Sequence, residues 1–158
     1  MISTKTWGVG LLSVASACGA AAQPERIAGL EVVFESPQVL VQAGPMPAEM
    51  GKARAVPVQV LIDGIGVPLR MPGGTQAASA VAYMQVRCQG GVWAIERLTA
   101  FEAAGGKGAA LVSGQAPAGQ LSWNRLDRKS QPTPSLLMEW LDLAAARQCA
   151  GVAAAQAH

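Results

Sequence analysis

Histidine is almost absent from this 158-residue chain, because the only one is the last residue, His158. A serine or cysteine nucleophile that works with histidine needs an imidazole held in the body of the domain. Charge is scarce too: charged residues make up 14% of the chain, and the formal net charge is +2. So small a charge does not predict nucleic acid or an anionic membrane surface as a partner. The sequence therefore favours a protein without catalytic histidine and without a polyanionic ligand.

Aromatic residues make up only 4% of the sequence. The core should therefore consist mainly of small and β-branched side chains with few large anchors. No stretch after residue 22 is apolar for long enough to cross a membrane as a helix, so we expect no integral membrane span in the mature chain. The length suggests a single domain. We expect that domain over residues 23–150, followed by a flexible alanine-rich tail over residues 151–158.

The first 22 residues have the three parts of a secretory signal peptide. Lys5 supplies a positive charge, and the short apolar run WGVGLLSVASACGA follows. The letters AAAQ then place small residues at the −3 and −1 positions, which predicts cleavage before Gln23 and export to the periplasm or cell surface. The alternative is cleavage before Cys18 with a lipid on that cysteine. VASAC resembles a lipoprotein box, although Ala15 stands where leucine is usual.

Cleavage before Gln23 leaves two cysteines, Cys88 and Cys149. An even number of cysteines in an oxidising compartment favours a disulfide. Two separate buried thiols are the alternative. A metal site would need more ligands than two cysteines and a terminal histidine can supply, so we expect neither a metal nor a cofactor.

Strand patterns fill the first half of the chain. Residues 30–42, LEVVFESPQVLVQ, predict two short strands that break at Ser36-Pro37. Residues 54–63 predict another strand, with apolar side chains at period two: Val56, Val58, Val60 and Ile62. Pro57 lies inside this strand and has no N–H for a ladder, which predicts an edge strand or a bulge.

Residues 79–103 carry the clearest hairpin pattern. One face of its first strand is apolar and the other is mostly polar: Ala82, Met84, Val86 and Cys88 against Tyr83, Gln85 and Arg87. Gly90 and Gly91 tolerate the positive φ that a tight turn requires. Two further turns, AAGGKG and PAG, lead to the strand-like segments AALVSG and QLSWNRL.

A helix is predicted after Thr133, a suitable N-cap, with Pro134 at the first helical position. Its apolar stripe recurs at i, i+4: Leu137, Leu141, Ala145 and Cys149, with Trp140 and Ala144 alongside. Cys149 then lies in the last turn on the apolar face, and Cys88 lies near the end of a strand with that strand's apolar residues. A bridge between them would fasten the helix to the sheet and close a loop of about 60 residues, worth roughly 4 kcal/mol.

These patterns predict an α+β domain: a mainly antiparallel β-sheet with one C-terminal helix packed on it and one disulfide, Cys88–Cys149.

The second half of the chain, about residues 77–150, resembles the surface-adhesin protein E-like family of Gram-negative bacteria. The shared pattern is an aromatic-x-x-x-x-Cys strand, here Tyr83 to Cys88, the turn GGKG, Trp123 in the next strand, and a helix ending at Gln148-Cys149. The resemblance implies a sheet covered by a disulfide-linked C-terminal helix, in the periplasm or at the cell surface. The best-known members are lipoprotein adhesins for host matrix and serum proteins, and this chain departs from them in its lipoprotein box.

Carboxylates could support catalysis without histidine. The candidates are Asp63, Glu96 and Glu102. Nothing in their spacing brings two of them together, so we interpret them as solvated strand-end or turn residues. The motifs GGKG and GIG lack the rest of a phosphate-binding pattern and are interpreted as turns.

Tryptophan offers two interpretations. Trp93 and Trp123 could be exposed stacking anchors for a sugar or peptide, or they could fill a core that is short of large side chains. Trp140 lies on the apolar stripe of the helix and is expected in the core.

The function expected from these features is that of an exported, non-catalytic binding module of the cell envelope, adhesin-like by resemblance. Its partner would be a protein of the host matrix or of the envelope. The alternative is a periplasmic structural or assembly accessory protein. A histidine-independent hydrolase is a third hypothesis.

Overall fold

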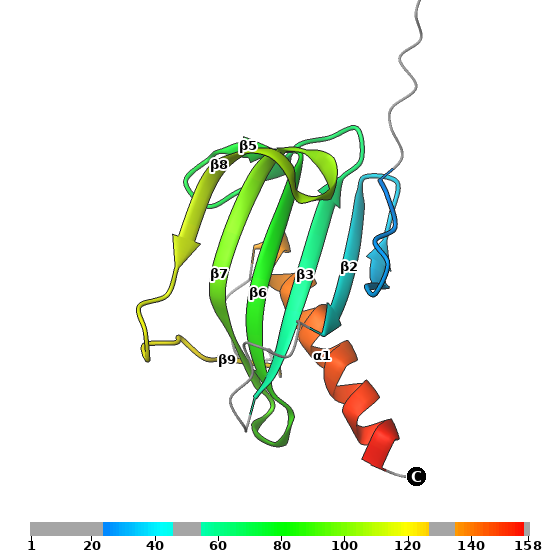
Figure 1. Ribbon diagram of the computed structural model, residues 1–158, viewed down its shortest axis with the longest axis vertical. Coiled ribbons are helices and arrows are strands. Elements are labelled where there is room, and N and C mark those ends of the chain that lie inside the picture. The colour runs from blue at the N-terminus through cyan, green and yellow to red at the C-terminus, as the bar shows by residue number, and fades with distance from the viewer. Residues whose placement is uncertain (1–23, 46–54, 127–134, 157–158) are drawn as a thin grey trace, which may run out of the picture.

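A computed structural model describes residues 24–45, 55–126 and 135–156 (Figure 1). The predicted signal peptide, its cleavage site before Gln23, and the predicted cap at Thr133-Pro134 lie outside the described residues. The described chain forms a twisted main antiparallel sheet and a small two-stranded sheet, with a single helix lying across one face of the main sheet. This confirms the predicted α+β class.

The main sheet has seven strands in the order β1-β2-β3-β6-β7-β8, with β9 also paired to β7. A separate pair, β4 and β5, lies in the connection between β3 and β6. The strands are β1 (Glu31–Glu35), β2 (Val39–Pro45), β3 (Val56–Gly64), β4 (Leu69–Arg70), β5 (Gln76–Ala77), β6 (Ser79–Arg87), β7 (Val92–Ala103), β8 (Lys107–Gln115) and β9 (Asn124–Arg125). The helix is α1 (Leu136–Gln156), and short 3-10 turns lie at Cys88–Gly90 and Ala104–Gly106.

The predicted break between the first two strands is confirmed at Ser36. The Ser36 hydroxyl accepts hydrogen bonds from the backbone N–H groups of Gln38 and Val39, which closes the turn locally. Strand β2 is then buried almost throughout. Its Gln42 side chain is fully buried, and its amide hydrogen-bonds twice to the backbone that precedes β1. Oε1 accepts from the Ile27 N–H at 2.9 Å, and Nε2 donates to the Glu25 carbonyl at 3.0 Å.

On the predicted apolar face of β3, Val58, Val60 and Ile62 have no exposed surface, whereas the opposite face becomes buried only toward the end of the strand, at Leu61 and Asp63. The edge strand or bulge predicted from Pro57 is wrong, since β3 lies between β2 and β6 and its register with β6 is continuous at Pro57. Pro57 pairs with β6, whereas among the described residues the pairing of β2 with β3 ends one residue further in, at Pro45 opposite Val58. Pro57 is the second residue of β3, so the missing N–H falls at the start of the strand, where proline is tolerated.

The predicted hairpin is confirmed as β6 and β7. Gly91 has φ 57°, the left-handed conformation that this turn requires. Ala82, Met84 and Val86 are fully buried on one face, as expected. One extra residue, Glu96, lies in a bulge between the pairs Tyr83–Arg97 and Met84–Ile95.

Helix α1 packs its apolar stripe onto the sheet. Four residues of the stripe are buried: Leu137, Leu141, Ala144 and Ala145. The backbone N–H of Met138 donates to the Ser135 hydroxyl at 3.4 Å, so Ser135 caps the described start of the helix. The helix runs to Gln156, past its expected end near Ala150, because the alanines of this segment, the residues of highest helix propensity, outweigh Gly151 and Val152. Among the described residues, no helix is long and apolar enough to cross a membrane.

The predicted disulfide is confirmed. Cys88 and Cys149 are bonded, with their Cα atoms 5.2 Å apart. Cys88 follows β6 directly. The predicted place of Cys149 in the last turn of the helix is wrong, because α1 continues for about two turns beyond it. The bond joins positions 61 residues apart in the sequence and fixes the helix against the β6–β7 hairpin.

Candidate functional site

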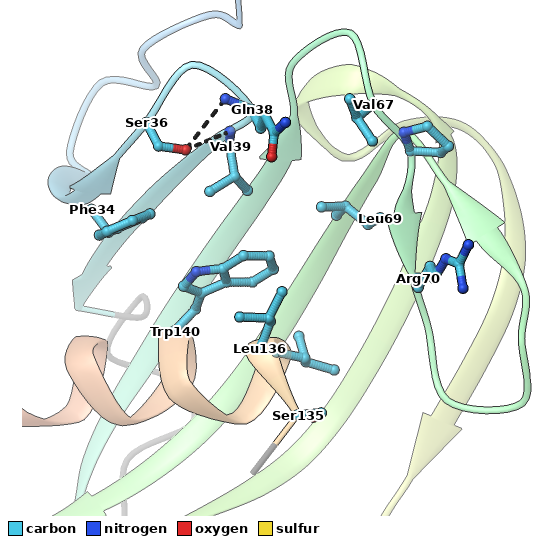
Figure 2. Close-up of a pocket in the computed structure, with 12 residues that line it drawn as sticks. Phe34, Ser36, Gln38, Val39, Val67, Leu69, Arg70, Ser135, Leu136 and Trp140 are labelled. Atoms are coloured by element: carbon cyan, nitrogen blue, oxygen red, sulfur yellow. Dashed lines mark hydrogen bonds between the residues drawn. The ribbon is translucent and has the colours of Figure 1, made fainter. Parts of the chain in front are cut away.

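An open groove lies where the start of α1 approaches the β1–β2 turn and the segment leading into β4 (Figure 2). Its volume is about 520 Å³, within the range of about 300–1,000 Å³ that is common for ligand sites. We call it the apolar groove. It is lined by Phe34, Ser36, Gln38, Val39, Val67, Pro68, Leu69, Arg70, Ser135, Leu136, Leu137 and Trp140.

Exposed apolar side chains gather around this groove. Among the described residues, six large apolar side chains are exposed, and three of these line the groove. Phe34 is 37% exposed, Val67 50% and Leu136 65%. Singly scattered apolar side chains on a surface need no explanation, but a cluster around a concave site is typical of a binding surface.

The walls of the groove come from three separate parts of the sequence. Figure 2 shows the side chains of Phe34, Leu69 and Trp140 converging from β1, β4 and α1. The backbone N–H of Ile65 donates to the Gln38 carbonyl at 2.8 Å, which fixes the connection after β3 against the β1–β2 turn. Arg70 lies at the rim, turned away from Trp140.

The tryptophans divide between core and surface. Trp93 is completely buried, as one of its two interpretations predicted, and its Nε1–H donates to Asp142 Oδ1 at 2.7 Å. Trp123 is half-buried, with the Arg87 guanidinium 4.0 Å from its ring centroid. The prediction for Trp140 is wrong in part, because this residue is only half-buried and forms a wall of the apolar groove.

The interpretation of Asp63 as a solvated residue is wrong, because its side chain is fully buried. Its Oδ1 accepts from the Gly105 N–H at 2.6 Å, and its Oδ2 accepts no hydrogen bond from the described residues. Burial raises the pKa of the Asp63 carboxyl, and the Gly105 hydrogen bond and the positive charge of Lys107 offset this only in part. Beside it, the Ser79 hydroxyl accepts from the Gly106 N–H at 3.0 Å and donates to the Ala103 carbonyl at 2.5 Å. These two side chains fasten the β7–β8 turn to the sheet.

The other two candidate carboxylates have separate partners. Glu96 Oε2 accepts from Gln85 Nε2 at 3.0 Å, and Glu102 Oε1 accepts from the Ala109 N–H at 3.0 Å. Asp63 lies on β3, which does not adjoin β7, where both glutamates lie. The structure therefore brings no two of these three carboxylates together as a catalytic pair, in agreement with their spacing in the sequence.

The glycine-rich motifs form turns, as predicted. Gly105, Gly106 and Gly108 of the GGKG motif all have positive φ, between 68° and 81°. In addition, a side chain at Gly106 would meet Val81 Cγ2 at 2.8 Å. These glycines are explained by the turn and its close packing. Within residues 24–45, 55–126 and 135–156, no three or more His, Cys, Asp or Glu side chains are grouped to hold a metal ion.

Sequence reasoning missed the apolar groove. Phe34, Val67 and Leu136 are far apart in the chain, and each alone is an ordinary strand, loop or helix residue. The only local signal is that Leu136 and Trp140 are spaced i, i+4, which continues the apolar surface of the helix beyond its buried stripe.

Comparisons with protein-family models, with curated proteins and with solved structures found no match for this chain.

Proposed function

We propose that this protein is an exported, non-catalytic binding module of the bacterial cell envelope, adhesin-like in that it binds another protein. The apolar groove is the observation that supports the proposal. It places three of the exposed large apolar side chains around one concavity, beside a half-buried tryptophan. Protein–protein contacts typically have aromatic and apolar residues at their centre and polar residues around the rim. Export follows from the signal-peptide pattern of the sequence.

Binding of defined proteins to the mature chain, residues 23–158, tests this function. Purified matrix and serum proteins and purified envelope proteins are immobilised separately, and binding is measured by surface plasmon resonance. We expect saturable binding to one of them and a loss of at least tenfold in affinity on Leu136→Gln, as expected for an apolar contact at the centre of an interface. Leu143→Gln is the matched control, because Leu143 is an exposed leucine of the same helix, 45% exposed, outside the groove. Binding that survives Leu136→Gln unchanged would contradict the role of the groove.

A second candidate function is that of a periplasmic structural or assembly accessory protein. Strand β8 favours it, because this strand forms an edge of the main sheet and all nine of its residues are exposed. An exposed edge strand is a surface onto which another chain can add a strand. Protease treatment of intact cells distinguishes the two functions: a surface adhesin is digested, whereas a periplasmic accessory protein is protected until the outer membrane is opened.

A further inference from the structure

The polar groups of the apolar groove indicate what kind of segment it would accept. The Ser36 hydroxyl already accepts two backbone hydrogen bonds, and the Ser135 hydroxyl accepts one. The side chains of Gln38 and Arg70 make no hydrogen bond or ion pair with the described residues. The side-chain polar groups most available to a ligand are therefore an amide, which both donates and accepts, and a guanidinium.

Arg70 differs from most other arginines of the described chain. Arg26 and Arg147 form ion pairs with glutamates, while the guanidinium groups of Arg87 and Arg97 lie over aromatic rings. Arg70 has neither kind of partner among the described residues. Of the described residues that line the groove, Arg70 is the only charged one, and none of them is acidic. The charge that complements this surface is negative, and a planar carboxylate matches the geometry of a guanidinium.

We propose that the apolar groove binds an extended peptide segment that places a large apolar side chain between Phe34 and Trp140 and a carboxylate at Arg70. This inference rests on the proposed binding function. The Gln38 amide favours a peptide over a fatty acid, since it can pair with a backbone amide between the apolar side chain and the carboxylate. The segment crosses the groove from the β1–β2 turn to the rim formed by β4.

Paired peptides test the inference. N-acetylated tetrapeptides with Leu, Phe or Trp at the third position and alanine at the C-terminus are prepared as free acids and as C-terminal amides, so that one backbone amide separates the apolar side chain from the carboxylate. Their affinities are measured by NMR titration of the mature chain. We expect the free acid to bind about two- to fivefold more tightly than its amide, the size of effect typical of an exposed ion pair. The largest shifts should fall on the Trp140 indole N–H and on the backbone of residues 67–70.

Two substitutions separate the parts of the site. Arg70→Gln should abolish the preference for the acid and leave the affinity for the amide unchanged. Leu136→Gln should weaken acid and amide alike, and the matched Leu143→Gln should weaken neither. Equal affinity for acid and amide in the unsubstituted protein would overturn the inference, as would failure of every peptide to bind.

These failures are distinguishable from failure of the proposed function. If a protein ligand binds and depends on Leu136 while acid and amide peptides behave alike, the function stands and the carboxylate inference falls. If octanoate displaces the peptides and binds more tightly than any of them, the groove is a site for acyl chains, and the peptide inference falls. If no protein ligand binds and no peptide binds, both fall together.

Discussion

The two flanks of helix α1 are held in different ways. One flank faces the β6–β7 hairpin, where Cys149 is bonded to Cys88 and Asp142 accepts the hydrogen bond from Trp93. The other flank faces β1 and β2, where the Arg147 Nε lies 3.8 Å from a Glu31 carboxylate oxygen and both side chains are mostly exposed. Exposed ion pairs of this kind contribute about 0–1 kcal/mol. The first flank is thus fixed covalently, and the second is open.

The spacing of residues along the helix explains the division. Asp142 and Cys149 are seven residues apart and therefore lie on one side, whereas Leu136 and Trp140 are four apart and lie on another. Fixing one flank holds the helix in place without filling the space along the other. A rigid wall with exposed apolar side chains is the arrangement that a binding groove needs.

The largest effect on stability is expected from removing the disulfide that fixes the first flank of the helix. The double substitution Cys88→Ser/Cys149→Ser should lower the free energy of unfolding by roughly 4 kcal/mol, the chain-entropy value for a loop of this length. Urea unfolding followed by circular dichroism measures it. Because the buried leucines of α1 still favour docking, we expect a folded but weakened domain. A change below about 1 kcal/mol would show that the two flanks do not differ as we describe.

Trp93→Phe tests the hydrogen-bonded part of the same flank. The change removes the indole N–H that Asp142 accepts and leaves a smaller ring in a fully buried position. We expect a loss of about 1–3 kcal/mol in the free energy of unfolding, from the hydrogen bond and from packing. Trp123→Phe is the control: this half-buried ring contacts Arg87, and its change should cost about 0.5–1 kcal/mol. Equal losses in the free energy of unfolding for the two variants would show that the Trp93 hydrogen bond does not help to hold the helix on the sheet.

The substitution Asp63→Asn tests whether the buried carboxyl in the sheet beneath both flanks makes the free energy of unfolding depend on pH. The folded-state pKa of Asp63 is raised above its ordinary value, so the folded protein binds more protons than the unfolded chain between those two values. The stability due to Asp63 is therefore fully present below the ordinary pKa and is lost as pH rises through the raised one. Asparagine keeps the Oδ1 acceptor for Gly105 and should remove this pH dependence.

The measurement is the difference between the unfolding free energies of the two proteins across the acidic to neutral range. We expect wild type to lose stability relative to Asp63→Asn as pH rises. A difference that does not change with pH, or one that changes in the opposite direction, would show that the buried carboxyl does not titrate in the folded domain as the sign of its pKa shift requires.

The smallest effect on stability is expected on the open flank. Leu136→Gln replaces a side chain that is 65% exposed by a good helix former, so the free energy of unfolding should change by less than about 0.5 kcal/mol. Leu143→Gln should behave alike. Thermal unfolding of both variants provides the measurement. A large loss for Leu136→Gln alone would mean that this leucine supports the fold, and the contrast between the flanks would disappear.

The sequence by itself determined the elements of this domain. The period of two in β3, the Gly90-Gly91 turn and the i, i+4 stripe of α1 are local patterns, and each formed close to where it was predicted. The pairing of Cys88 with Cys149 followed because two apolar faces, each with one cysteine, bury themselves best against each other.

Only the tertiary structure decided the burial of Asp63, the interior position of β3 and the existence of the apolar groove. Strand order depends on which sheet edges meet, and a strand with a proline near its start, such as Pro57 of β3, can still be central. Asp63 is buried because the β7–β8 turn, more than forty residues later, folds over it and donates a hydrogen bond. The groove combines residues from β1, the β4 region and α1, so no local pattern contains it. A concave surface is a property of how elements approach one another, and periodicity along a chain carries no information about that approach.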